Sequence, residues 1–117
     1  GWMDWSMATV ELMYRLRALT PWPGFFTTVR GKRLRVIQAE PLTTEEAAIH
    51  VTDPDADPGT IVGFMKGFGP IVRTGTGVLL LLRVQLEGKA QMTASDFMRG
   101  FKLEIGTRLG LPPAKST

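Results

Sequence analysis

The sequence predicts a mainly β fold with short helices (α+β), built as a small antiparallel barrel or sandwich. About five stretches of strand length are separated by turn signals with no helical segment between them. A helical pattern precedes these stretches, and a shorter one follows them. The 117 residues, of which 44% are hydrophobic, suffice for one folded domain over residues 1–117 and are too few for two.

The first element is a helix expected within residues 3–19, "MDWSMATVELMYRLRAL". Its apolar side chains recur at three- and four-residue spacing, at Met7, Val10, Leu12 or Met13, Tyr14 and Leu16. Asp4 or Ser6 is expected to cap the helix by accepting a hydrogen bond from a free backbone N–H. Pro21 ends the helix near Thr20, because proline lacks an N–H and disfavours helical geometry in the residue before it.

A rigid corner follows this helix. Pro21 and Pro23 flank Trp22, and we expect the corner to turn the chain from the helix into the sheet, with Trp22 packed as a wedge. We expect Arg17, just before the corner, to anchor it by binding backbone carbonyls or Asp4.

Two strands joined by a tight turn come next, in "FFTTV" (25–29) and "RLRVIQAE" (33–40), with a glycine in the turn. Leu34 and Val36 alternate with arginines in the second strand, so one face of this hairpin is apolar and the other is basic.

Aromatic residues beside these arginines allow two interpretations. Trp22, Phe25 and Phe26 could stack on nucleobases, as in many proteins that bind single strands. Alternatively, Trp22 and at least one of the phenylalanines lie in the core, and this is the interpretation we favour.

The net charge of +3 is unevenly distributed. Residues 40–57 hold six of the eleven acidic residues and no Lys or Arg, so the rest of the chain carries fourteen basic residues against five acidic ones. A basic body with one acidic segment favours a polyanionic partner, although an ordinary solvated surface is the alternative. Pro54 and Pro58 interrupt the acidic part, so residues 42–57 are predicted to be a long loop.

The second half of the chain reads as further strands and a closing helix. A strand is expected within 58–66, and a hairpin over 70–88 with "TGTG" as its turn. The nearly continuous apolar run 78–86 predicts a central strand. A short helix is expected over 93–106, and the tail 111–117 is expected to be frayed. Oligonucleotide-binding folds are barrels of this size.

The chain offers little catalytic chemistry. It has no cysteine and a single histidine, His50, which lies in the acidic segment. The "DPDAD" stretch lacks the glycine and glutamate positions of an EF-hand, and "GFGPIV" lacks the third glycine of a dinucleotide-binding loop. We therefore expect neither a catalytic nor a metal site in this chain.

The sequence also lacks membrane signals. Its longest apolar run, residues 77–82, is too short to cross a bilayer, and the start has no signal-peptide pattern. A chain that begins with Gly rather than Met suggests a domain cut from a longer protein. The absence of cysteine fits a reducing compartment, so a cytoplasmic location is expected.

An ordered set of motifs resembles the C-terminal domain of methionyl-tRNA formyltransferases. The motifs span residues 4–106 in the order that the family has, and none is decisive alone. They are Asp4-Trp5-Ser6, Arg17-Ala18-Leu19 leading to Pro21-Trp22-Pro23-Gly24, Pro58-Gly59, Thr74-Gly75-x-Gly77, Gln85 with Gly88-Lys89, and Met92 with Asp96-Phe97.

The resemblance implies a role in binding tRNA. In that family the full enzyme transfers a formyl group from 10-formyltetrahydrofolate to the methionine carried by initiator tRNA. Its catalytic N-terminal domain, which holds the folate site, has no counterpart in this chain. The resemblance thus implies an oligonucleotide-binding-like barrel that holds initiator tRNA by its backbone. Such a barrel needs no cofactor of its own, works beside the N-terminal domain of the same protein, and is not catalytic alone.

We assign the expected phosphate contacts to basic residues on strands and turns, namely Arg30, Lys32, Arg33, Arg35, Arg73 and Lys89. Two departures from the family pattern weaken the resemblance locally. Thr76 stands where the family usually has Asp, which tolerates a positive φ more readily than Thr does. Ala90 follows Lys89 where a second lysine is usual, which removes one candidate phosphate contact.

The resemblance also leaves an alternative function open. The same domain occurs in related folate-dependent formyltransferases and hydrolases that do not act on tRNA, where it is mainly structural. The basic face predicted for residues 30–35 of the hairpin favours the tRNA interpretation, because a spacer domain has no need of it.

Overall fold

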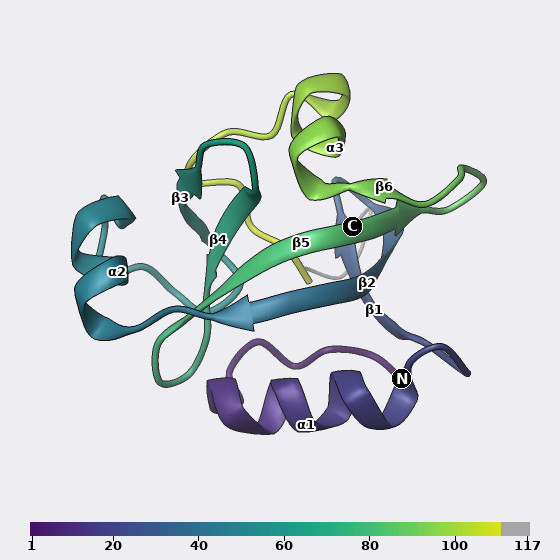
Figure 1. The fold of residues 1–117 in the computed structure, drawn as a ribbon, viewed down its shortest axis with the longest axis horizontal. Coiled ribbons are helices and arrows are strands. Elements are labelled where there is room, and N and C mark those ends of the chain that lie inside the picture. Colours follow the sequence, from purple (N-terminus) through teal and green to yellow (C-terminus); the bar gives the residue numbers. More distant parts are fainter. Residues whose placement is uncertain (111–117) are drawn as a thin grey trace, which may run out of the picture.

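The computed structural model of the chain describes residues 1–110, which form helices around a curved antiparallel sheet (Figure 1). The helices are α1 (Thr9–Leu19), α2 (Thr44–His50) and α3 (Ala94–Phe101). The strands are β1 (Phe25–Val29), β2 (Lys32–Pro41), β3 (Ile61–Met65), β4 (Gly69–Arg73), β5 (Val78–Leu86) and β6 (Met92–Thr93). The predicted mainly β, α+β class is confirmed. The tail 111–117, expected to be frayed, lies outside the described residues.

The sheet has the strand order β1-β2-β5-β4-β3, with the short β6 paired to β5. The run over β5 is central, as its apolar sequence predicts, because it pairs with β2, β4 and β6. Helix α1 packs on β2, and α3 packs against β4 and β5 (Figure 1). Neither β6 nor α2 was expected from the sequence.

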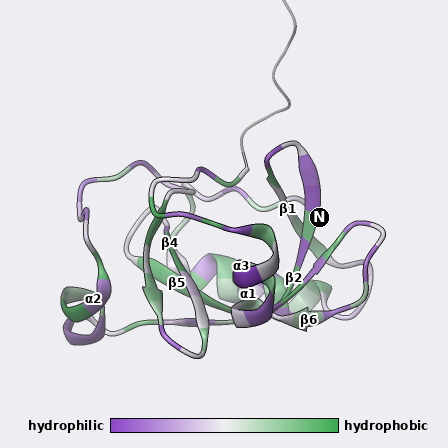
Figure 2. Cartoon of the chain, turned by 90° about the horizontal axis from the view of Figure 1, so that it is seen from above, coloured by the Kyte–Doolittle hydropathy of each residue, from purple (hydrophilic) through white to green (hydrophobic). Residues whose placement is uncertain are grey.

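The core lies in two parts on either side of the central strands. The larger cluster joins α1, α3 and the inner face of β1, β2 and β5, and includes Phe25, Leu34 and Val36. The smaller cluster contains Val62 and Ile71, and residues of the α2 region pack against it. Figure 2 shows apolar residues along β5 and hydrophilic ones on the turns and on parts of α2 and α3.

The sheet is open, which corrects the expectation of a barrel. Among the described strands, β1 and β3 are the two edges and do not pair with each other. The segment 106–110 lies between them instead. The Leu109 N–H donates to the Gly59 carbonyl just before β3 (2.8 Å), and the Gly110 N–H donates to the Thr28 carbonyl of β1 (2.9 Å). Irregular backbone thus occupies the position where a closing strand pair would lie.

Trp5 fills the space beside this junction. Its side chain is 5% exposed, and its indole Nε1–H donates to Thr27 Oγ1 of β1 at 2.9 Å. Gly110 has a φ of +78°, and a Cβ there would lie 2.9 Å from the Cδ1 atom of Trp5. Glycine is therefore needed at this position both for its backbone conformation and for the close approach of the indole.

Helix α1 begins later than the sequence predicts. It starts at Thr9, and its N-cap residue, Ala8, makes no side-chain capping bond. The Asp4 carboxylate instead accepts from the backbone N–H of Ser6 (3.0 Å) and from its hydroxyl (2.6 Å). These two bonds lower the pKa of Asp4, the hydroxyl bond contributing more. The buried residues are Leu12 and Leu16, whereas Val10 and Tyr14, which the spacing placed on the apolar face, are exposed.

The "TGTG" turn supplies the missing cap. Thr76 Oγ1 accepts from the Thr9 backbone N–H at 3.1 Å, and the Thr9 and Thr74 hydroxyls are bonded at 2.7 Å. Gly75 lies so close to the start of α1 that a Cβ there would be 2.0 Å from the Ser6 carbonyl oxygen. The described non-glycine residues with positive φ do not include Thr76. The turn therefore accommodates threonine without backbone strain.

The acidic segment is not the long loop that was expected. Thr43 and Glu46 form a capping box at the start of α2, in which each side chain accepts from the other's backbone N–H (3.1 and 3.0 Å). The bond from the Thr43 backbone is the main cause of a lowered pKa at Glu46. The T-x-x-E spacing is present in the sequence, but the prolines that follow it favoured a loop.

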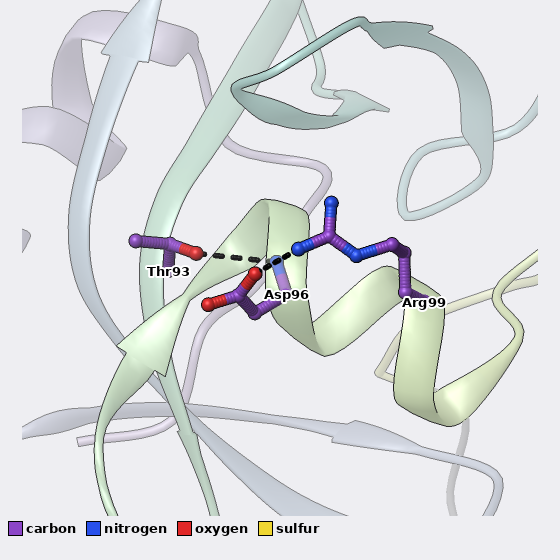
Figure 3. Close-up of polar contacts among 3 residues, drawn as sticks. All are labelled: Thr93, Asp96 and Arg99. Atoms are coloured by element: carbon purple, nitrogen blue, oxygen red, sulfur yellow. Dashed lines mark hydrogen bonds and ion pairs between the residues drawn. The ribbon is translucent and has the colours of Figure 1, made fainter.

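Helix α3 begins with half of the capping box that the sequence predicts (Figure 3). Thr93 Oγ1 accepts from the Asp96 backbone N–H at 3.1 Å. The Asp96 carboxylate does not return this bond and pairs with Arg99, one helical turn further on. Aspartate is one methylene shorter than the glutamate usual at this position, so its carboxylate reaches back to the N-cap backbone less readily.

The corner after α1 has a geometry different from the one expected. The Trp22 side chain is 82% exposed, so its predicted role as a packed wedge is wrong. Phe25 is buried in the core, as expected for at least one of the phenylalanines. The Gly24 N–H donates to the Leu19 carbonyl at 2.7 Å and fixes the corner. Arg17 is also exposed and makes no hydrogen bond to any described residue, so it is not the expected anchor.

We expect the two tryptophans to differ in their contribution to stability. Trp5→Ala should lower the free energy of unfolding by roughly 3–5 kcal/mol, because it empties the junction between the sheet edges. Trp22→Ala should change it by less than about 0.5 kcal/mol, because its side chain is in solvent. Urea unfolding of both variants measures this, and an equal loss in the two would contradict the assignment.

Two glycine substitutions should have opposite effects. Gly75→Ala should destabilise the chain by roughly 1–3 kcal/mol, because the added methyl overlaps the Ser6 carbonyl. Gly100→Ala should stabilise it by about 0.5–1 kcal/mol, because this helical position has open space around it. Thermal unfolding of both variants tests the docking of the turn. A neutral Gly75→Ala would show that the turn can move away from α1.

Candidate functional site

The strand pairing places aromatic, basic and amide side chains on one face of the sheet. Phe26 of β1 lies opposite Arg35 of β2, which in turn lies opposite Gln85 of β5. Leu34 is buried, while Arg33 is exposed, as the alternation in the sequence predicts. A cleft of about 430 Å³ opens on this face. Its charged, aromatic and amide-bearing lining residues are Trp22, Phe26, Arg33, Arg35, Gln85 and Glu87.

The Phe26 ring organises the two arginines of the cleft. The Arg33 Cζ lies 4.9 Å from the ring centroid and the Arg35 Cζ lies 5.9 Å from it, both within cation–π range. Trp2 packs against Phe26, with the ring centroids 6.0 Å apart. Phe26 thereby holds the planar guanidinium of Arg33 at the mouth of the cleft without occupying its N–H donors.

The Arg35 guanidinium is partly occupied by a contact within the protein. It is half-buried, and one terminal nitrogen of its guanidinium donates to the Pro21 carbonyl in the corner. Its Nε is buried and meets no acceptor among the described residues. Arg35 therefore ties the corner to the sheet, and it contributes charge to the cleft more than free hydrogen-bond donors.

Arg30 holds the end of α3 in place. It lies in the β1–β2 turn with a φ of +48° and is followed by Gly31 at +79°, as in a type I′ hairpin. Its guanidinium donates to the carbonyls of Phe101 (2.8 Å) and Lys102 (3.0 Å). These carbonyls are at the C-terminal end of α3, where a cation is favourable. Arg30 thus joins the hairpin to the closing helix.

Arg73 lies outside the cleft, at the other end of the sheet. Its guanidinium donates to the carbonyls of Pro54 (2.6 Å) and Gly77 (3.3 Å). It therefore ties the acidic segment to the "TGTG" turn. It lines a separate groove between α1 and α2, so the structure does not bring it together with the other predicted site residues.

The remaining three predicted residues present their charge to solvent. Lys32, Arg33 and Lys89 are exposed, and within residues 1–110 their side chains make no hydrogen bond or ion pair. Lys89 belongs to the β5–β6 turn, which adjoins the cleft through Gly88. This turn is ordered by bonds from the Lys89 N–H to Leu86 O (3.0 Å) and from Gln85 Nε2 to Lys89 O (2.9 Å). Such cations can bind anionic oxygens without breaking a bond within the protein.

Two residues of the site were not expected from the sequence. The Glu87 carboxylate accepts from the backbone N–H of Arg33 at 2.6 Å and fixes the rim of the cleft. Trp2 supports Phe26 from the N-terminal segment. Glu87 follows an apolar strand directly, a position that favours a rim residue, whereas no sequence signal joins Trp2 to Phe26.

Comparison with known families assigns the domain. The family model described as "Formyl transferase, C-terminal domain" matches residues 1–102. The chain belongs to this family. The resemblance inferred from the motifs is thereby confirmed. The tryptophan of the Asp4-Trp5-Ser6 motif fills the junction of the sheet edges.

Relatives of this domain carry the name methionyl-tRNA formyltransferase. The chain is 38% identical to the one from Symbiobacterium thermophilum over 112 residues, which cover 96% of this chain and 32% of that protein. It is 40% identical to the one from Treponema pallidum over 111 residues, covering 95% and 33%. The chain therefore spans about a third of the length of these relatives.

The fold also resembles that of a solved structure. A multiply substituted variant of HypX from Aquifex aeolicus matches 91% of this chain and 18% of its own, with a TM-score of 0.65 and 15% sequence identity. This likeness concerns the fold. In residues 1–110, no helix is both long enough and apolar enough to cross a membrane.

Alanine substitutions at Arg30 and Lys32 should distinguish a cation that stabilises the fold from one that only faces solvent. Arg30→Ala should lower the free energy of unfolding by about 1–2 kcal/mol, because the carbonyls at the end of α3 lose their charged donor. Lys32→Ala should leave it within about 0.5 kcal/mol. Chemical unfolding of both variants measures the difference. Equal midpoints would mean that Arg30 does not hold α3.

Proposed function

We propose that this chain is the tRNA-binding C-terminal domain of a methionyl-tRNA formyltransferase and that it holds initiator tRNA by its phosphate backbone. The parent protein would transfer a formyl group from 10-formyltetrahydrofolate to methionyl-tRNA in the cytoplasm. The folate site and the catalysis would belong to its N-terminal domain, so the present chain would not be catalytic alone.

The observation that carries this proposal is the set of three solvent-facing cations, Lys32, Arg33 and Lys89, on β2 and in the β5–β6 turn. A cation that is already paired gains little from a phosphate, whereas these three have no competing acceptor among the described residues. Each phosphate that they neutralise releases condensed counterions, which is the main source of sequence-independent affinity.

The placement of the acidic residues supports binding of tRNA on the β1–β2–β5 face. Glu45 and Glu46 lie on α2, and the alternating aspartates 53–57 follow it. In Figure 1, α2 lies at the opposite end of the domain from the β5–β6 turn. A phosphate backbone would therefore be attracted to the β1–β2–β5 face and repelled from the α2 end.

Removing cations from this face should weaken tRNA binding in proportion to the number of phosphates that they neutralise. About four phosphate contacts would lower the affinity of the chain for initiator tRNA roughly a hundredfold between about 50 and 200 mM salt. For the Arg33→Ala, Lys89→Ala double variant, the affinity should fall only roughly tenfold between the same two salt concentrations, because this variant neutralises about two phosphates fewer. It should also bind initiator and elongator tRNAs with equally reduced affinity, because backbone contacts carry no sequence information.

A matched variant controls for net charge. Lys66→Ala, Arg99→Ala removes the same two charges from the β3–β4 turn and from α3, outside the cleft. We expect it to keep most of the salt dependence of the wild type. Equal losses of affinity in the two double variants would mean that net charge alone, and not this face, determines the affinity for tRNA. No tRNA binding at the lower salt would favour the alternative that the domain is a structural appendage.

A further inference from the structure

We propose that the cleft beside Trp22 binds one unpaired nucleotide of the RNA, with the base stacked on the Trp22 indole and the adjoining phosphate on Arg33. This inference rests on the proposed function and adds to it. A backbone grip needs only cations, and this cleft has an aromatic surface that such a grip does not require.

The first argument is the exposure of Trp22. Its side chain is 82% exposed although a tryptophan gains much free energy from burial. Pro21 and Pro23 restrict its backbone on both sides, and the corner is bonded to α1 at Leu19 and to β2 through Arg35. The indole therefore projects from a fixed point beside the cleft, and little backbone entropy is lost when a base stacks on it.

The second argument is the pairing of planar cations with aromatic rings around the same space. Arg33 stacks over Phe26 at 4.9 Å, and its guanidinium donors have no protein acceptor among residues 1–110. A guanidinium held by a ring in this way can bind a phosphate and also offer its face to a base. Trp22 and Arg33 both line the cleft, so a nucleotide can meet an aromatic face and a phosphate donor together.

The third argument concerns the rim. One oxygen of Glu87 accepts from the Arg33 backbone, and the Oε1 atom of Gln85 accepts no hydrogen bond among the described residues. These groups leave acceptors beside a positively charged cleft. The exocyclic amino group of a base can donate to such acceptors, whereas a polyanion without hydrogen-bond donors cannot.

An unpaired nucleotide fits these features better than a base-paired one. In a duplex the bases stack on one another and their faces are covered, so an indole on the protein surface has no partner. In a loop or a single-stranded end the base can turn out and stack on an aromatic side chain. The cleft volume of about 430 Å³ lies within the range of sites for single small ligands.

The test compares two RNAs of one sequence, a ten-nucleotide single strand of mixed sequence and the duplex that it forms with its complement. Trp22→Ala should lower the affinity for the single strand roughly ten- to hundredfold and leave the affinity for the duplex within about twofold. The salt dependence of RNA binding by this variant should equal that of the wild type, because stacking releases no counterions. The quenching of tryptophan fluorescence by the single strand should largely disappear in this variant.

Two variants serve as controls. Phe68→Ala removes another exposed aromatic, 53% accessible and outside the cleft, and should bind both RNAs like the wild type. Arg33→Ala should weaken binding to both RNAs and reduce the salt slope by about one. Each variant is first checked for an unchanged melting temperature.

The outcomes separate this inference from the proposed function. Equal effects of Trp22→Ala on both RNAs, or no effect on either, would overturn the stacking site, while binding that still responds to Arg33→Ala would leave the backbone grip intact. Absence of binding to both short RNAs and to initiator tRNA at low salt would overturn both proposals.

Discussion

The arrangement of this domain depends on how Trp5 fills the junction between the two edges of the open sheet. Its indole bonds to Thr27 of β1 and packs against Gly110, whose backbone N–H donates to Thr28. An unpaired sheet edge exposes N–H and C=O groups that would otherwise need another chain. The N-terminal and C-terminal segments satisfy these groups, and the buried indole fixes both segments on β1. The hairpin that bears the basic face therefore has a fixed position.

The arginines of the hairpin show how the position of a cation in the hairpin decides what it binds. Arg30, Arg33 and Arg35 lie within six residues of sequence, yet only Arg33 keeps its guanidinium donors free of protein acceptors among the described residues. Arg30 reaches unpaired carbonyls at the end of α3, and Arg35 reaches the carbonyl of Pro21. Helix ends and proline corners expose carbonyls that have no internal donor, and the nearest guanidinium binds them.

Much of this fold can be predicted from local patterns, because the strands and the closing helix follow periodicities that the core enforces. The alternation of Leu34 and Val36 with arginines gave the correct faces, and the apolar run over β5 gave its central place. The failures have physical causes. The sequence favours Trp22 in the core because tryptophan is apolar, but the corner leaves it in solvent while Phe25 is buried. The start of α1 could not be located, because its cap comes from Thr76, sixty-seven residues away. The Arg30 and Arg73 partners are likewise carbonyls distant in the sequence, at the end of α3 and in the acidic segment, which no residue pattern records.

The exposure of Trp22 is a consequence of the same constraints that fix the basic face. Arg35 must reach the Pro21 carbonyl and the Gly24 N–H must reach the Leu19 carbonyl for the corner to close. A Cβ on Gly24 would lie 3.0 Å from Arg35 Nε and from the Phe26 ring, so the corner already packs tightly against the hairpin. With the inner side occupied by Phe26 and Arg35, the side chain of residue 22 has only solvent and the cleft before it. A small polar residue at this position would expose less apolar area to solvent than a tryptophan does. A tryptophan at this position therefore adds little to the stability of the domain, and the proposed nucleotide site would give its exposed face a partner.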